Sequence, residues 1–113
     1  MVNFDFKENY GIDDLLRIME LLRSPGGCPW DAEQTRESIR RNLIEEAYEL
    51  CEGIDNNDVE LMKEETGDVM LQSVFHGVIG KYNDEFTIDD TLDEVCKKLI
   101  SRHPHVFGDV EAK

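Results

Sequence analysis

The sequence predicts an all-α fold: one domain in which four helices joined by short loops form a bundle. Apolar residues recur three and four positions apart through most of the chain, which is the helical period. The only β-like segment, Phe-Thr-Ile at 86–88, is too short to count as a strand. With 113 residues and neither an internal repeat nor a low-complexity linker, the chain has the length of one domain, spanning 1–113.

The first helix is predicted over 12–24, where Leu15, Ile18, Met19 and Leu22 form one apolar stripe. It ends there because Pro25 disfavours helix at the residue before it and two glycines follow. The loop Pro-Gly-Gly-Cys-Pro-Trp-Asp comes next.

A long helix is predicted from Thr35, a suitable N-cap, to 54, where Asp-Asn-Asn-Asp forms a turn. The following helix spans 58–81. The last one opens at Thr87 with Asp90 three residues later, which resembles a capping box, and it ends before Pro104. We expect it to turn a stripe inward, formed by Leu92, Val95, Cys96 and Leu99. The tail 105–113 has no usable periodicity.

The formal net charge of −14 argues against binding to nucleic acid polymers or to anionic membranes. No apolar run approaches the ~18–20 residues of a membrane span, and the N-terminus lacks the pattern of a signal peptide. We therefore expect a cytoplasmic protein. The three cysteines lack zinc-site spacing; Cys51 and Cys96 fall in helical patterns and are expected in the core as reduced thiols.

Two pairs of acidic residues stand in line with apolar stripes of successive helices. Glu46 and Glu49 share a stripe of the second predicted helix, together with Ile39, Leu43 and Leu50. Glu65 and Asp68 share a stripe of the next helix, together with Leu61, Leu71, Gln72 and Phe75, and Glu64 lies beside them. Residues three apart on a helix lie ~4.5 Å apart along its axis and project from similar sides.

These acids have two interpretations. Buried, unpaired carboxylates are costly, and a divalent cation such as Mg²⁺ would relieve both their desolvation and their mutual repulsion. The alternative is an ordinary solvated acidic face, because the chain has 26 Asp and Glu residues and such a spacing also arises by chance. Two antiparallel helices could bring the pairs into one acidic pocket. A di-iron site is discounted, because no histidine follows a glutamate at the required spacing.

Four stretches of the chain together resemble the MazG-type nucleoside triphosphate pyrophosphohydrolases of the all-α NTP pyrophosphohydrolase superfamily. They are GGCPWDAEQT (26–35), LIEEAYEL (43–50), EETGDVMLQSVFH (64–76) and SRHPHVFGD (101–109). The resemblance implies Mg²⁺-dependent cleavage of the α–β phosphoanhydride of an NTP or dNTP, yielding nucleoside monophosphate and pyrophosphate, as in house-cleaning of the nucleotide pool. Mn²⁺ is an expected substitute.

The resemblance also implies roles for individual residues. Glu46, Glu49, Glu65 and Asp68 would bind the metal. Glu45 and Glu46 are the expected catalytic acids, Glu45 either as an outer ligand or as the group that positions the attacking water.

Three further residues are candidates for substrate contacts, each with a structural alternative. Lys98 and Arg102 lie four apart on the last helix and could bind phosphates, although cations also suit a helix C-terminus. Trp30 could stack on a base or cap the core. His76 is expected to be a hydrogen-bonded residue inside the bundle.

The family resemblance implies that a second copy of the domain completes the bundle, so we expect a homodimer or a larger oligomer. Relatives often continue beyond the last motif, so the chain is either a short form or one domain of a longer protein. A different function stays open: a catalytically weak, acidic helical module for dimerisation or regulation.

Overall fold

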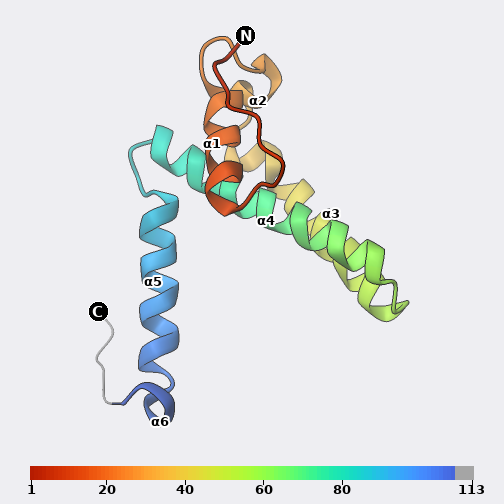
Figure 1. Ribbon diagram of the computed structural model, residues 1–113, viewed down its shortest axis with the longest axis vertical. Coiled ribbons are helices and arrows are strands. Elements are labelled where there is room, and N and C mark those ends of the chain that lie inside the picture. Colours follow the sequence, from red (N-terminus) through yellow and green to blue (C-terminus); the bar gives the residue numbers. More distant parts are fainter. Residues whose placement is uncertain (109–113) are drawn as a thin grey trace.

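The structure, a computed structural model, describes residues 1–108. In this range it contains helices and no strand, which confirms the all-α class (Figure 1). The helices are α1 (Ile12–Arg23), α2 (Pro29–Glu33), α3 (Arg36–Asp55), α4 (Val59–Tyr82), α5 (Ile88–Ser101) and α6 (Pro104–Phe107). The four long helices agree with the predicted ranges to within one or two residues.

Local side-chain contacts fix where these helices begin. The hydroxyl of Thr35 accepts a hydrogen bond from the backbone N–H of Ser38 at 3.2 Å and so caps α3. Asp58 caps α4 in the same way, with its carboxylate 3.2 Å from the backbone nitrogen of Leu61. Thr87 and Asp90 cap α5 reciprocally, as the sequence predicts. Each cap satisfies an amide that the helix itself leaves unpaired.

The core is centred on α4. Helix α3 runs antiparallel along α4, and α1 crosses the C-terminal half of α4 (Figure 1). The buried apolar side chains come from these three helices: Met19, Ile39, Val74, Phe75, Val78 and Ile79. Leu15, Leu16, Leu22 and Leu71 pack around them. Residues 59–70, the N-terminal half of α4, lie outside this apolar cluster, so the acidic residues of α4 occupy a separate part of the interface with α3.

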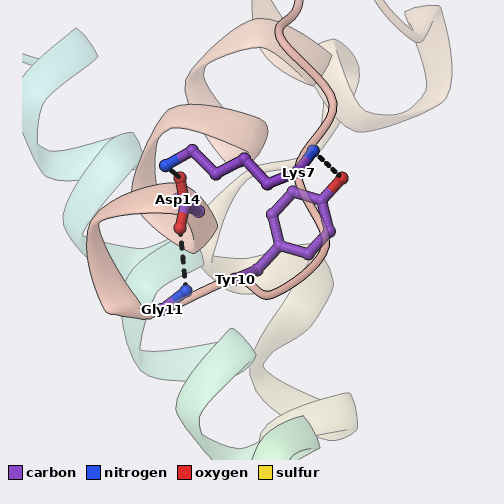
Figure 2. A network of polar contacts seen from close by, with 4 residues as sticks. All are labelled: Lys7, Tyr10, Gly11 and Asp14. Atoms are coloured by element: carbon purple, nitrogen blue, oxygen red, sulfur yellow. Dashed lines mark hydrogen bonds and ion pairs between the residues drawn. The ribbon is translucent and has the colours of Figure 1, made fainter.

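The N-terminal segment is tied to the start of α1 by a small polar network (Figure 2). Lys7 Nζ lies 2.6 Å from one carboxylate oxygen of Asp14, and the other oxygen accepts a hydrogen bond from the backbone N–H of Gly11 at 2.8 Å. The backbone N–H of Lys7 donates to the hydroxyl of Tyr10. The bond with Lys7 lowers the pKa of Asp14 and raises that of Lys7, so both groups are charged. The segment is thereby fixed on α1.

Helix α5 leaves the other helices and runs away from the α3–α4 hairpin, with α6 at its far end (Figure 1). Its base is anchored on α4, where the side chain of Ile88 occupies the space above Gly77. The expectation that α5 turns its apolar stripe inward is wrong within this chain: Leu92, Val95, Cys96 and Leu99 are all exposed. The period identifies the residues that share a face, but nothing in residues 1–108 covers that face.

Other expectations need correction too. Cys51 is exposed on the outer side of α3 rather than in the core. Part of the predicted loop before Thr35 forms the short helix α2, and part of the aperiodic tail forms α6. The remainder of that tail, 109–113, including the last residue of the fourth family motif, lies outside the described residues. No helix in the described range has both the length and the apolarity that crossing a membrane requires.

Candidate functional site

Three carboxylates meet across the interface of α3 and α4. Glu46 and Glu49 come from the middle of α3, and Glu65 comes from the N-terminal half of α4. One oxygen from each lies within 4.8 Å of the others. Glu65 is only 4% exposed, Glu46 is half-buried and Glu49 is exposed. The group therefore has a buried base and an open side, which is the form of a site that an ion enters from solvent.

A second group of carboxylates shares Glu65 with the first. Glu64, Glu65 and Asp68 also bring one oxygen each within 4.8 Å of one another, all from α4. Asp68 is half-buried and Glu64 is exposed. The four acids singled out by the sequence are thus joined through Glu65, which belongs to both groups, and Glu64 extends the set.

The proximity of these groups perturbs the ionisation of Glu65. A hydrogen bond with Glu46 raises the pKa of Glu65 to about 8, and burial and the neighbouring Glu49 act in the same direction. Protonation is the usual response of a buried carboxyl beside other carboxylates, because a second negative charge there would be repelled. At neutral pH and without a metal, the carboxyl of Glu65 therefore holds a proton. A bound cation would balance the charge of the carboxylates in its place.

The donor set fits a hard divalent cation. Glu46 Oε2 and Glu65 Oε2 are both buried without a hydrogen-bond partner. Buried polar atoms are normally paired, so free carboxylate oxygens on two facing helices have the capacity to coordinate an ion. All the candidate donors are carboxylates, which Mg²⁺ and Mn²⁺ prefer and softer metals do not. Glu46, Glu49 and Glu65 form one set of oxygens that could hold such an ion, and Glu64, Glu65 and Asp68 form another.

Glu45 points to a different environment from Glu46. It is exposed, and its carboxylate lies 2.9 Å from Nε of Arg41, one turn earlier on α3. It belongs to neither carboxylate group. Exposed pairs of this kind are weak, so Glu45 is free to exchange partners.

The proposed phosphate ligands do not reach the acidic residues within one chain. Lys98 lies on α5, in a shallow groove lined with Phe86, Thr91 and Val95. Arg102 caps the C-terminus of the same helix. Both cations belong to the C-terminal part of α5, and α5 packs on α4 only at its base and extends away from the α3–α4 hairpin (Figure 1).

Trp30 lies on α2 with an exposed side chain, so it does not cap the core of this chain. Its backbone carbonyl accepts a hydrogen bond from the side chain of Gln34, which fixes the short helix rather than the indole. The ring is free to contact another molecule.

The helix interface also buries polar atoms of two residues to which the sequence assigned no role in the site. Gln72 is 8% exposed and its Oε1 has no hydrogen-bond partner. His76, expected to be hydrogen-bonded in the bundle, has a buried Nε2 that is likewise unpartnered. Burial, and secondarily the charge of Arg36, lowers the pKa of His76, so the ring is neutral at pH 7. The sequence feature that could have identified them is their spacing, because Gln72 and His76 follow Asp68 by four and by eight residues.

The chain shares its sequence with proteins of one family. The model of the MazG nucleotide pyrophosphohydrolase domain matches residues 34–107, which include both carboxylate groups and α5. A Thermotoga maritima protein named nucleoside triphosphate pyrophosphohydrolase/pyrophosphatase MazG is 56% identical over 97 residues, 86% of this chain and 38% of that protein. A nucleoside triphosphate pyrophosphohydrolase of Escherichia coli is 41% identical over 103 residues, 90% of this chain and 39% of its own length.

A third relative, named nucleoside triphosphate pyrophosphohydrolase, comes from Mycobacterium tuberculosis and is 42% identical over 97 residues, 84% of this chain and 29% of that protein. The chain thus spans about two fifths or less of the length of these relatives. The match of the family model over most of the chain, and the identity of these relatives over more than four fifths of it, agree with the helical fold and with the carboxylates on α3 and α4. The chain belongs to the MazG nucleotide pyrophosphohydrolase domain family.

Proposed function

We propose that this domain hydrolyses nucleoside triphosphates, ribo or deoxy, between the α and β phosphates, releasing nucleoside monophosphate and pyrophosphate. The observation that carries the proposal is the buried carboxyl of Glu65, placed within reach of acids from both α3 and α4. The printed names of the relatives supply the reaction class.

The cofactor in this proposal is Mg²⁺, with Mn²⁺ as a substitute, held by Glu46, Glu49, Glu65 and Asp68. Such an ion supplies charge neutralisation for the triphosphate and Lewis acidity at the phosphate that is attacked. This requirement also explains how a chain of net charge −14 attracts an anionic substrate. Without the cation, the same carboxylates would repel the phosphates.

The protein groups then have separate tasks. Glu65, at the buried base, would hold the cation in its deprotonated form, and the half-buried Glu46 and Asp68 would be further ligands. The exposed Glu45, once it leaves Arg41, would orient the attacking water and accept a proton from it. Each task follows from how deeply the carboxyl is buried.

A second copy of the chain completes the site in this proposal. The stripe of Leu92, Val95 and Leu99 on α5 is exposed, as are Ile44 and Tyr48 on the outer face of α3. Exposed apolar surface of this kind is typical of an interface, and the partner's α5 would bring a second Lys98 and Arg102. Trp30 is a further substrate contact in the assembled enzyme. A cytoplasmic role in clearing unwanted nucleotides suits this activity.

The alternative function is a catalytically weak dimerisation or regulatory module. It would explain the exposed apolar stripes equally well, but it would not explain why the carboxylates of α3 and α4 lie together. The two are separated by mixing the protein with Mg²⁺ and a panel of nucleoside triphosphates and analysing the products. Pyrophosphate and monophosphate in equal amounts support the proposal. A protein that dimerises but releases neither product from any nucleotide is the regulatory module.

A further inference from the structure

Gln72 is a buried polar residue that no group in the described chain satisfies. Its side chain is 8% exposed, and its Oε1 is buried without a hydrogen-bond partner. A buried acceptor without a donor destabilises a folded protein, because the desolvated oxygen has lost its bonds to water. A leucine of similar length would fill the same space without this cost, so the amide needs another explanation.

The position of Gln72 relates it to the carboxylates. Asp68, Gln72 and His76 follow one another at intervals of four residues and lie along one ridge of α4. Each interval advances ~6 Å along the helix axis. Asp68 and His76, one helical turn on either side of Gln72, are half-buried, so the ridge reaches solvent at both of these residues.

One end of this ridge is acidic, and the side chain at its other end is uncharged. At its acidic end lie Glu65 and Asp68, and at its other end the imidazole of His76 is uncharged, with Nε2 buried and unpartnered. A nucleotide has the same order of parts: charged phosphates, a sugar with hydroxyl donors, and an uncharged base. With its phosphates at the carboxylates, the sugar falls about one helical turn away, beside Gln72.

We propose that Gln72 is a specificity-determining residue that accepts a hydrogen bond from a sugar hydroxyl of the bound nucleotide. The inference rests on the proposed function, because it needs the phosphates at the acidic residues. The unpartnered oxygen is the acceptor, and the hydroxyl is the donor it lacks. A site built around such a bond rejects analogues that lack the hydroxyl, because the buried oxygen is then left unpaired.

The test is a binding experiment on the full chain with nucleotides that cannot be hydrolysed. Ribo, 2′-deoxy and 2′,3′-dideoxy α,β-methylene triphosphates of one base are titrated calorimetrically with Mg²⁺ into wild type, Gln72→Leu and the control Ser73→Ala. Ser73 is an exposed neighbour of Gln72 on α4. Thermal unfolding of each protein is measured without nucleotide or metal. Gln72→Met is a second variant, should Gln72→Leu fail to fold.

In wild type and Ser73→Ala, affinity should fall roughly threefold to tenfold at one step of the series, where the recognised hydroxyl is removed. In Gln72→Leu that step should disappear, while the unfolding temperature stays equal or rises. A step retained in Gln72→Leu, or no step in wild type, overturns the inference. So does a lower unfolding temperature with the step unchanged, which would make Gln72 a structural residue. A wild type that binds no nucleotide would refute the proposed function first, and this inference with it.

Discussion

The carboxyl of Glu65 on α4 lies close to that of Glu46 on α3, and each has one oxygen that is buried without a hydrogen-bond partner. Two like groups in such a place are an electrostatic cost to the fold without metal. A cation bound there would remove that cost, so the proposed activity and the pH dependence of the fold would be linked through these two side chains.

Removing a proposed metal ligand should abolish turnover without unfolding the protein. Glu49→Gln and Asp68→Asn keep the shape of the side chain but lose the charge that holds the cation. Their loss of repulsion should leave the unfolding temperature without metal unchanged or higher. Glu60→Gln is the matched control, since Glu60 is exposed on α4 in a surface pair with Lys63. Full turnover in both ligand variants at saturating Mg²⁺ would show that these residues hold no metal.

The stability of the metal-free protein should fall as the pH rises towards 8. The pKa of Glu65 is raised from 4.5 to about 8, so between these values the folded state holds a proton that the unfolded state has lost. Folding is therefore favoured by this group at low pH, and its contribution is lost as the pH passes through the folded-state pKa. Thermal unfolding in EDTA from pH 5 to 9 measures the effect.

Glu65→Gln serves as the reference for that experiment, because other acids of this chain also titrate. As the pH rises, the unfolding temperature of wild type should fall relative to that of Glu65→Gln. Mg²⁺ added at pH 8 should stabilise wild type only. Parallel curves for the two proteins would mean that Glu65 has an ordinary pKa.

The joint between α4 and α5 should tolerate no side chain at Gly77. A methyl group there would overlap Ile88, the residue that anchors the base of α5, so Gly77→Ala should cost about 1–3 kcal/mol through overpacking. Gly67 on the same helix has open space around it, and Gly67→Ala should gain up to about 1 kcal/mol from helix propensity. Urea unfolding compares the two. Equal effects of both substitutions would contradict the described contact with Ile88.

The exposed stripe of α5 should hold two chains together. Wild type is expected at twice the monomer mass or more in light scattering at micromolar concentration. Leu92→Glu combined with Leu99→Glu puts charges into that stripe and should yield monomers. Lys97→Ala, an exposed change on the same helix, is the control. A wild type that is monomeric at these concentrations would rule out the assembly.

Much of this fold could be predicted because its signals are local. Thr35 and Thr87 cap the helices that they were expected to open, since capping depends only on the next three residues. The helical period placed Glu46 and Glu65 on stripes that an antiparallel pair of helices could bring together, and the structure brings them together. The spacing of the charged residues therefore identified, from the sequence, the acids that form the two carboxylate groups.

The rest depended on long-range contacts that a period does not encode. The stripe with Leu92 and Leu99 was identified correctly, but period does not say which surface covers a stripe, and here none within the described chain does. Gln72 looked like an ordinary polar residue, because only its burial and its unpartnered oxygen distinguish it. The sequence left open whether Trp30 stacks on a base or caps the core, and the short helix α2 holds it at the surface.

The central claim is that the carboxylates of α3 and α4 serve cleavage between the α and β phosphates, and one product analysis tests it most directly. Wild type is incubated with a panel of ribo and deoxyribonucleoside triphosphates with Mg²⁺ or with EDTA, and pyrophosphate and orthophosphate are measured separately. The account predicts pyrophosphate and nucleoside monophosphate in equal amounts, only with the metal. Orthophosphate as the sole product, or pyrophosphate release that persists in EDTA, would contradict it.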